Sequence, residues 1–529
     1  MPVLSPFSDA IFRRTYAITP DETWEQCARR VAHYVADNHE QEERFYVLIR
    51  DRILMPGGRY LWSAGKRVSH LSNCFGLTVE DNRESWATLL HDVTMCLSTG
   101  GGLGVNYSAC RGYGAPIKTL GGYASGPISL MSMVNEVARH VMAGGSRRSA
   151  LWSGLQWDHP DIHRFIETKD WDANVRAMKE KSVEYPAPLD MTNVSVIVDQ
   201  RYLDGLTQRD PVIMALHAKI CERMARTGEP GFANFARSQQ DDPGMVTHNA
   251  CTESTLHKND SCNLSSIVMP RIRDLSHLEE VTRTAIQFLY LGSMKATYPT
   301  EEIASVVAKN RRLGLGIMGL HEWMVTRGSG RYEWGNALQS WFSTWKDVAD
   351  DEAKNFAGRM NGPIPVATRA IAPTGTISII AEVTSGIEPV YCTSYRRRYM
   401  KANKHFYQYV VDPTAKRLMD LGVQPESIED AYSLSADIRR RLDVHAGISA
   451  MTDQSIANTL NIPAYGTSWN TDSSYLAGVV AEYLPKIKGF TAYPNGARSS
   501  QPLSPVALEE ALGMDGVVFE EGDKESPTG

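Results

Sequence analysis

Short runs of β-branched and apolar residues alternate with longer amphipathic stretches over most of this 529-residue chain. Runs such as NCFGLTV, NVSVIV, TISIIAEV and GFTAYP are typical of buried strands, whereas ESWATLLHDVTMCLSTG has helical spacing. This alternation predicts an α/β architecture. No internal repeat or low-complexity linker interrupts it between about residues 67 and 500, so we expect one large domain there.

The two ends of the chain have other patterns. Residues 1–66 are predicted to be a helical segment, because Trp24, Cys27 and Val31 recur at helical spacing and the sequence MPGGRY stops a second helix. Residues 501–529 end in EEGDKESPTG, which is acidic and polar, so we expect a disordered tail.

Charge and composition exclude several classes of function. The formal net charge of −6 argues against a nucleic-acid binder. No apolar run of about 18 residues and no secretory leader is found, so we expect a cytoplasmic protein without a membrane partner. The eight cysteines include no CxxC pair, and the sequence predicts no metal site of that kind.

The segment HNACTE carries the first candidate chemistry. Asn249, Cys251 and Glu253 lie two residues apart, so an extended segment would point all three side chains the same way. Burying an amide and a carboxylate together is costly unless they bind something. Cys262 follows eleven residues after Cys251, and Cys74 lies on another apolar run. The two could cycle between dithiol and disulfide, or each could be a buried small side chain.

Three further segments are weaker signals. STGGGLGV holds glycines that allow a close backbone approach or a tight turn, but its spacing does not fit a dinucleotide-binding turn. The hydroxyl-rich turn in IAPTGTIS could hold a phosphate, although it is no Walker A motif. GGSRRS is a loop whose arginines could contact a base or phosphate, or could simply be solvated.

Taken together and in order, these motifs resemble the catalytic subunit of ribonucleotide reductases. The resemblance runs from about residue 45 to residue 503 through SNC, GGGLGVNYS, GGSRRSA, DHPDI, NACTE, SCNL, NRRLGLGIMG, IAPTGTIS, TDQSIANT and KGFTAYPNGAR. It implies a ten-stranded α/β barrel, made of two antiparallel halves of five parallel strands, with a finger loop through its centre and an N-terminal helical segment.

The resemblance also implies roles for residues. Cys251 would become a transient thiyl radical that removes the 3′ hydrogen of a ribonucleotide, Glu253 would take the proton of the 3′ hydroxyl, and Asn249 would hold the hydroxyls. Cys74 and Cys262 would give two electrons and become a disulfide. The substrate would also contact a set of polar and turn residues. These are Asn73, Ser108, Pro373, Thr374, Gly375, Thr376 and Ile377.

Adenosylcobalamin is the radical source that the resemblance favours. The eleven-residue spacing between Cys251 and Cys262 is typical of the cobalamin-dependent class. The diiron-dependent class relays its radical through two tyrosines on the last strand, where this chain aligns Thr491 and Ala492. No segment similar to that of the glycyl-radical class is present.

Regulation and partners follow from the same resemblance. Asp81, Lys118, Ser146 and Arg147 align with residues that contact a deoxynucleotide or ATP effector, and we expect a homodimer. No cysteine follows Cys392, so the tail cysteine pair of relatives is absent from this sequence. Either the tail is truncated, or a thioredoxin-like or other reductant reaches the active-site disulfide directly.

Three alternatives remain open. The chain could be the large subunit of a diiron-dependent enzyme that needs a small radical-donating subunit. It could be an inactive nucleotide-binding regulator. It could also be a cysteine hydrolase, but its nearest histidine, His248, would point to the opposite side of an extended segment from Cys251.

Overall fold

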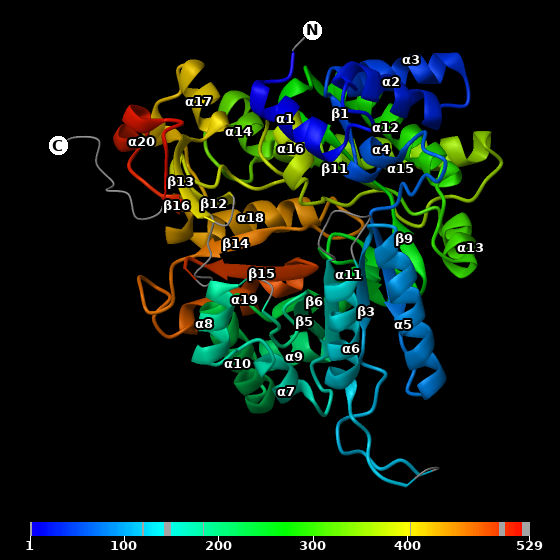
Figure 1. Ribbon diagram of the computed structural model, residues 1–529, viewed down its shortest axis with the longest axis vertical. Helices are drawn as coiled ribbons and strands as arrows, with labels where there is room; N and C mark the ends of the chain where they lie inside the picture. Colours follow the sequence, from blue (N-terminus) through cyan, green and yellow to red (C-terminus); the bar gives the residue numbers. More distant parts are fainter. Residues whose placement is uncertain are drawn as a thin grey trace.

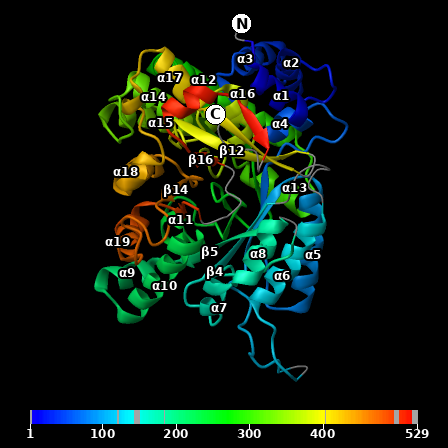
Figure 2. The ribbon, with the colours of Figure 1, turned by 60° about the vertical axis from the view of Figure 1, so that its left-hand side comes forward.

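A helical layer at the N-terminus packs against one side of a barrel (Figures 1 and 2). The computed structural model describes residues 3–118, 121–141, 150–182, 185–401, 404–496 and 503–520. The layer consists of α1 (Pro6–Thr15), α2 (Trp24–Val35), α3 (His39–Arg50) and α4 (Gly58–Ser63). Thr23 and Gln26 form a capping box at the start of α2, which satisfies two backbone N–H groups that the helix leaves unpaired.

Five parallel strands form the first half of the barrel. They are β2 (Cys74–Thr78), β3 (Gly102–Asn106), β4 (Leu151–Gln156), β5 (Thr192–Val198) and β6 (Gly231–Asn234). Nearly all their residues are buried, as expected for parallel strands with both faces covered. The helices that connect and flank them are α5 (Arg83–Ser98), α6 (Pro127–His140), α7 (Ile162–Glu167), α8 (Ala173–Lys181), α9 (Gln200–Gln208), α10 (Pro211–Thr227) and α11 (Phe235–Asp241).

The second half also runs in parallel. β10 (Leu264–Val268) pairs with β11 (Gly314–Met318), Leu315 bridges to Arg369, and Ile371 bridges to Ile456. The last segment continues into β14 (Thr459–Ile462), which pairs with β15 (Gly489–Pro494). Its helices are α12 (Leu275–Lys295), α13 (Glu301–Asn310), α14 (Leu320–Arg327), α15 (Asn336–Arg359), α16 (Gly375–Ala381), α18 (Ile438–Ser449) and α19 (Ser474–Tyr483).

Two antiparallel contacts join the halves into a closed ring. Phe490 of β15 pairs with Phe232 of β6. On the other side, β9 (Asp260–Cys262) pairs with β2 and is separated from β10 only by Asn263. The ten-stranded barrel of two antiparallel halves is therefore confirmed.

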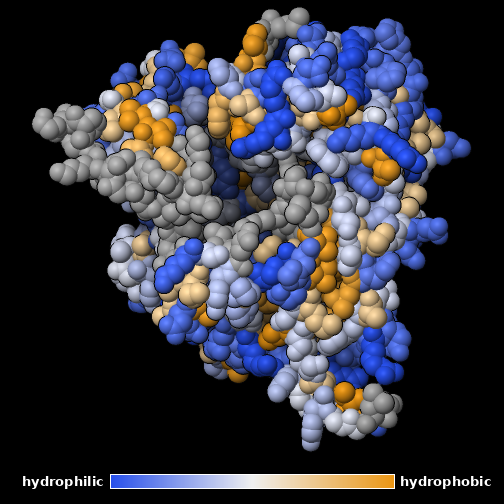
Figure 3. All heavy atoms as spheres, viewed as in Figure 1, coloured by the Kyte–Doolittle hydropathy of each residue, from blue (hydrophilic) through white to orange (hydrophobic). Residues whose placement is uncertain are grey.

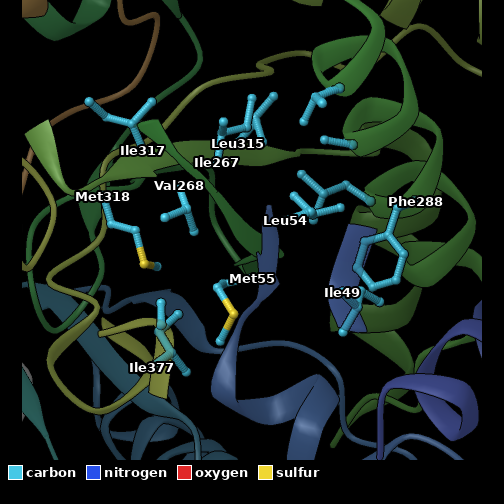
Figure 4. Close-up of a cluster of buried hydrophobic side chains, with 14 of the residues drawn as sticks. Ile49, Leu54, Met55, Ile267, Val268, Phe288, Leu315, Ile317, Met318 and Ile377 are labelled. Carbon is cyan, nitrogen blue, oxygen red and sulfur yellow. The ribbon is translucent and has the colours of Figure 1, made fainter. Parts of the chain in front are cut away.

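The N-terminal helices share one hydrophobic core with the second half of the barrel. Strand β1 (Leu54–Pro56) pairs antiparallel with β10. Figure 4 shows Ile49 of α3 and Phe288 of α12 beside Leu54, with Met55 and Ile377 further along the same cluster. Because these side chains are buried together, the helical layer is part of the folding unit that positions α16.

The expectation of a disordered tail is wrong for residues 503–520. β16 (Leu503–Pro505) and β17 (Val518–Glu520) flank the hairpin of β12 (Ser394–Lys401) and β13 (Lys404–Val411), and α20 (Leu508–Met514) buries Ala511. α17 (Pro413–Asp420) follows β13. Phe519 stacks on Tyr407, so apolar side chains within this polar tail are sufficient to dock it. None of the helices in the described residues is both long and apolar enough to cross a bilayer.

Candidate active site

A short hairpin passes along the inner face of the barrel. Its strands are β7 (Thr247–His248) and β8 (Thr255–Leu256), which pair antiparallel. Glycines in β2 and β3 make room for it. A Cβ atom at Gly76 would lie 2.7 Å from side-chain carbons of Leu256 and Thr247, and a Cβ atom at Gly104 would overlap the carbonyl oxygen of His248. The glycine-rich segment therefore allows a close backbone approach: the backbone of this hairpin, the finger loop, packs directly against β3.

The finger loop turns at residues 249–254. Thr252 has a φ of +67° and its N–H donates to the Asn249 carbonyl over 3.2 Å. Asn249 Oδ1 accepts from the Ser254 N–H at 3.0 Å. The expected extended segment is thus wrong, because a turn shapes the loop. Its tip leaves Cys251 exposed while Asn249 and Glu253 are buried.

Two cysteines meet beside this loop. Cys74 of β2 and Cys262 of β9 are register partners in the antiparallel junction, and both are free thiols. Their sulfur atoms and one carboxylate oxygen of Glu253 all lie within 4.8 Å of one another. Burial raises the pKa of the Cys262 thiol well above its usual value, and Cys74 and Glu253 add to the effect. Both sulfurs and the carboxylate share one buried space.

Glu253 is held ready to take up a proton. Burial raises the pKa of its carboxyl to about 7, and the nearby Asn249 side chain only partly opposes this. Within the described part of the chain, Glu253 Oε2 and Asn249 Nδ2 are buried without hydrogen-bond partners. Such atoms are costly in a folded core, so they indicate a polar ligand that supplies the missing partners.

Cys251 opens onto a cavity of about 520 Å³. The cavity is also lined by Pro373 and Gly375 at the start of α16, and by Thr491 and Ala492 of β15. Figure 3 shows a hollow on this face, at the level between α16 and β15 in Figure 1. Protein surrounds Cys251 on its other sides, so burial, Glu253 and Cys74 raise its pKa well above the usual value. At neutral pH Cys251 is therefore a thiol and no thiolate nucleophile.

His248 cannot act as a general base for the Cys251 thiol. Its ring packs against Trp152 and Phe235, each with a centroid distance of 5.6 Å. Burial lowers the pKa of His248 to about 4, and neither ring nitrogen has a hydrogen-bond partner among the described residues. A cysteine hydrolase needs the opposite arrangement.

In the turn before α16, some residues face the cavity, whereas the side chains of others hold the surrounding protein structure. Pro373 and Gly375 face the cavity, and Thr376 is half-buried. Thr374 has a φ of +49° and its hydroxyl accepts from the Gly386 N–H at 2.9 Å, so its side chain holds the neighbouring loop. The Ile377 side chain is part of the hydrophobic core (Figure 4). Only the backbone of Ile377 is left for binding a ligand.

Asn73 lies at the site and Ser108 does not. Asn73 donates its N–H to the Cys262 carbonyl at 3.2 Å, and its Oδ1 is buried without a partner among the described residues. Ser108 lies beyond the other end of β3, on the order of 20 Å along the strand from Gly102, and its Oγ accepts from the Gln156 N–H. The structure therefore separates Ser108 from the predicted substrate residues.

Of the predicted effector residues, Asp81 and Lys118 lie away from this site. Asp81 pairs with Arg111, with a distance of 2.6 Å from Oδ2 to Nε. Lys118 is exposed on the segment that projects from the barrel between β3 and α6 (Figure 1). Ser146 and Arg147 lie outside the described residues.

Sequence reasoning missed a buried polar network behind the finger loop. Arg312, which has no exposed surface, donates from Nε to Asp260 and from Nη2 to Asp242, each over 2.8 Å. His257, which follows β8, pairs with Asp242 over 2.7 Å, and Asn310 donates to Asp260 over 2.9 Å. The network ties the end of the finger loop to the strand of Cys262. A charged NRR segment directly before an apolar run was its only sequence signal.

Comparisons with known proteins give a consistent result. The family described as "Ribonucleotide reductase, barrel domain" matches residues 72–200, 190–340 and 342–488, and "Ribonucleotide reductase, all-alpha domain" matches residues 3–69. The vitamin B12-dependent ribonucleoside-diphosphate reductase of Mycobacterium tuberculosis strain CDC 1551 is 28% identical, over 91% of this chain and 76% of that protein. The protein of the same name from Thermoplasma acidophilum is 26% identical, over 76% of this chain and 57% of that protein.

A solved structure agrees in fold. The alpha subunit of the class Id ribonucleotide reductase of Actinobacillus ureae superposes with a TM-score of 0.73, over 94% of this chain and 99% of that chain. Sequence identity is 18%, so this likeness concerns the fold alone.

Proposed function

Because the chain belongs to the family of ribonucleotide reductase large subunits, we propose that it reduces ribonucleotides to 2′-deoxyribonucleotides by a thiyl-radical mechanism that oxidises a cysteine pair. One observation carries the proposal. The sulfurs of Cys74 and Cys262 and a carboxylate oxygen of Glu253 lie within 4.8 Å of one another, beside the loop that presents Cys251 to the cavity.

Each group has one role in the proposed chemistry. The Cys251 thiyl radical takes the hydrogen atom from C3′ and becomes a thiol. Glu253 accepts the proton of the 3′ hydroxyl, and the Asn249 amide donates to a substrate hydroxyl. A carboxyl with a pKa of about 7 suits this task, since at neutral pH a large fraction is ionised while the base remains strong.

The cysteine pair balances the reaction. The 2′ hydroxyl takes a proton and leaves as water, and the Cys74 and Cys262 thiols give up two electrons and two protons as their sulfur–sulfur bond forms. Cys251 then returns its hydrogen atom to C3′. The sum is one ribonucleotide and two thiols converted to one deoxyribonucleotide, one disulfide and one water.

The proposed substrate site extends from the finger loop to α16. Asn73, which precedes Cys74 and whose buried Oδ1 has no partner among the described residues, would contact the sugar. The backbone of Pro373–Ile377 would hold the phosphates, because the first N–H groups of a helix have no partner within it. The Thr374 hydroxyl acts indirectly, through the loop that it holds.

We propose adenosylcobalamin as the radical source. The fit rests on the cavity beside Cys251, where Thr491 of β15 presents a short side chain, with Asn458 and Tyr493 further along its wall. These residues would contact the cofactor. When bound, adenosylcobalamin supplies the organic radical that removes the hydrogen atom from the Cys251 sulfur. Two relatives whose names state dependence on vitamin B12 support the assignment.

Partners remain part of the proposal. We propose a homodimer, regulated by a deoxynucleotide or ATP and reduced by a thioredoxin-like protein. Helices α5 and α6 pack side by side and expose Met95 and Met133, which are 40% and 46% accessible, so they offer an apolar face for a second copy. The mass of the protein in solution, measured by light scattering, tests this point.

The experiment uses the purified chain with adenosylcobalamin, dithiothreitol and each ribonucleoside di- and triphosphate in turn. We expect deoxynucleotide from at least one of them without a second protein. Activity that requires a small radical-donating subunit would instead support the diiron-dependent alternative. A Thr491→Trp variant should weaken cobalamin binding, as followed by absorption, because the indole fills the cavity.

A further inference from the structure

We propose that the reduced cysteine pair is also a binding site for one soft divalent cation such as Zn²⁺ or Cd²⁺, held by Cys74 Sγ, Cys262 Sγ and a Glu253 carboxylate oxygen, and that the bound cation blocks turnover. The binding itself needs no radical, cofactor or substrate. Only the block of turnover rests on the function proposed above.

The distances among the three ligand atoms suit such a cation. They all lie within 4.8 Å of one another. A tetrahedral zinc ion with Zn–S bonds of about 2.3 Å needs its two sulfurs about 3.8 Å apart. Because Cys74 and Cys262 are register partners on adjacent strands, small side-chain rotations are enough to close the difference. Two thiolates and one carboxylate leave a fourth position open.

The carboxylate supplies a second and independent observation. Glu253 is 2% exposed, and its Oε2 has no hydrogen-bond donor among the described residues. A buried carboxylate oxygen without a donor is unfavourable, and a cation is one group that compensates it. The substrate hydroxyl fills this role during turnover, so the cation would compete for the same oxygen.

The surroundings favour a cation as well. The sulfurs lie in a cluster of small apolar side chains, where a metal–thiolate bond meets little competition from water. Its other members are Ala250, Leu256, Leu264, Ala370 and Ala372. The charged groups that act on the pKa of Cys262 are Cys74 and Glu253, which are themselves acids. If these groups ionise together, a divalent cation offsets their mutual repulsion.

Binding is a proton exchange without a change of oxidation state. The cation displaces one proton from each thiol, so M²⁺ and two thiols give a metal dithiolate and two H⁺, with Glu253 as the third ligand. In the oxidised protein the two sulfurs are bonded to one another and neither is a thiolate. The site therefore exists only in the reduced protein, and its occupation protects the pair from oxidation.

Cobalt(II) is a suitable probe, because its thiolate complexes absorb in the near ultraviolet. The full-length protein, reduced with a phosphine and kept anaerobic, is titrated with Co²⁺. We expect a thiolate-to-cobalt charge-transfer band that saturates at one equivalent and disappears when Zn²⁺ is added. The band should be absent from the oxidised wild-type protein, which has the same side chains, and from Cys262→Ser.

Matched controls identify the ligands. Cys110→Ser removes another buried thiol and Cys251→Ala removes the finger-loop thiol, and both should keep the band. A band of equal intensity in the oxidised protein or in Cys262→Ser would overturn the proposal, as would no band in the reduced wild type. Turnover should stop with one equivalent of Zn²⁺ and return with a chelator. If the chain binds cobalt in this way but reduces no nucleotide, the result contradicts the proposed function and supports the metal site.

Discussion

Cys74 and Cys262 face each other across the antiparallel junction that closes the barrel, with their Cα atoms in register. The same junction places both sulfurs beside Glu253 at the base of the finger loop. The fold thus brings together residues separated by nearly two hundred positions in the chain.

Removing the finger-loop sulfur should abolish turnover without affecting binding. In Cys251→Ala we expect no deoxynucleotide, because no other thiol opens onto this wall of the cavity among its described lining residues. Nucleotide affinity, measured by calorimetry, should stay within about twofold of the wild type, since a truncated thiol loses little contact area. Cys110→Ala, at a buried cysteine away from the cavity, should keep most activity. Substantial turnover by Cys251→Ala would refute the role of this residue.

Glu253→Gln should lower activity and raise stability at neutral and alkaline pH. The carboxyl has a folded-state pKa of about 7, above its ordinary value near 4.5. Below about pH 4.5 it is protonated in both the folded and unfolded states. Between there and about pH 7 the unfolded chain ionises first, so this group lowers stability as pH rises, by about 3 kcal/mol in total. The Gln variant lacks this loss and should be the more stable protein at pH 8.

Urea unfolding of wild type and Glu253→Gln at pH 5.5 and pH 8 measures this difference, with the exposed Glu84→Gln as a control. In the wild type, kcat/KM should rise with pH through about 7 as Glu253 becomes the base. An equal stability difference at both pH values would show that the carboxyl does not titrate as described.

Gly104→Ala should displace the finger loop. The added Cβ overlaps the His248 carbonyl, and backbone on both sides leaves little room to relax. We expect a loss of about 1–3 kcal/mol in the free energy of unfolding and a larger relative loss of activity. Gly358→Ala, in α15 with open space around it, should instead be neutral or slightly stabilising. Wild-type activity in Gly104→Ala would contradict the packing of the loop against β3.

Arg312→Met should destabilise the fold strongly. It leaves Asp242 and Asp260 buried without their main cation, and breaking such a group costs about 3–5 kcal/mol. Arg13→Met breaks an exposed pair with Asp9 and should cost less than about 0.5 kcal/mol. Thermal unfolding of both variants provides the test. A small effect at Arg312 would show that His257 and Asn310 alone hold the end of the loop.

The sequence allowed a large part of this arrangement to be predicted. Alternating strands and helices indicated the architecture, but the expectation of a strand at TISIIAEV is wrong, because most of it forms helix α16. The ordered motifs indicated the ring of strands that the pairings confirm. The convergence of Cys74, Cys262 and Glu253 was predicted through the resemblance, but the argument from an extended segment was wrong because Thr252 adopts a left-handed turn. Local periodicity cannot reveal a single residue with positive φ.

Other features depended on contacts that no local pattern encodes. Ser108 is next to a strand that enters the site, but only the direction of β3 shows that it lies at the far end. Ile377 is within a predicted binding turn, yet its side chain is needed by the core. The Arg312 network joins three separate chain segments, at residue 242, residues 257–260 and residues 310–312, so its charges are paired only once the barrel has closed.

The most direct test is a single turnover of fully reduced protein with nucleotide and adenosylcobalamin, without external reductant, followed by alkylation and peptide mass spectrometry. We predict one Cys74–Cys262 disulfide per deoxynucleotide formed, with Cys251 recovered as a free, alkylated thiol. Product formed without that disulfide, or a disulfide that contains Cys251, would contradict the account.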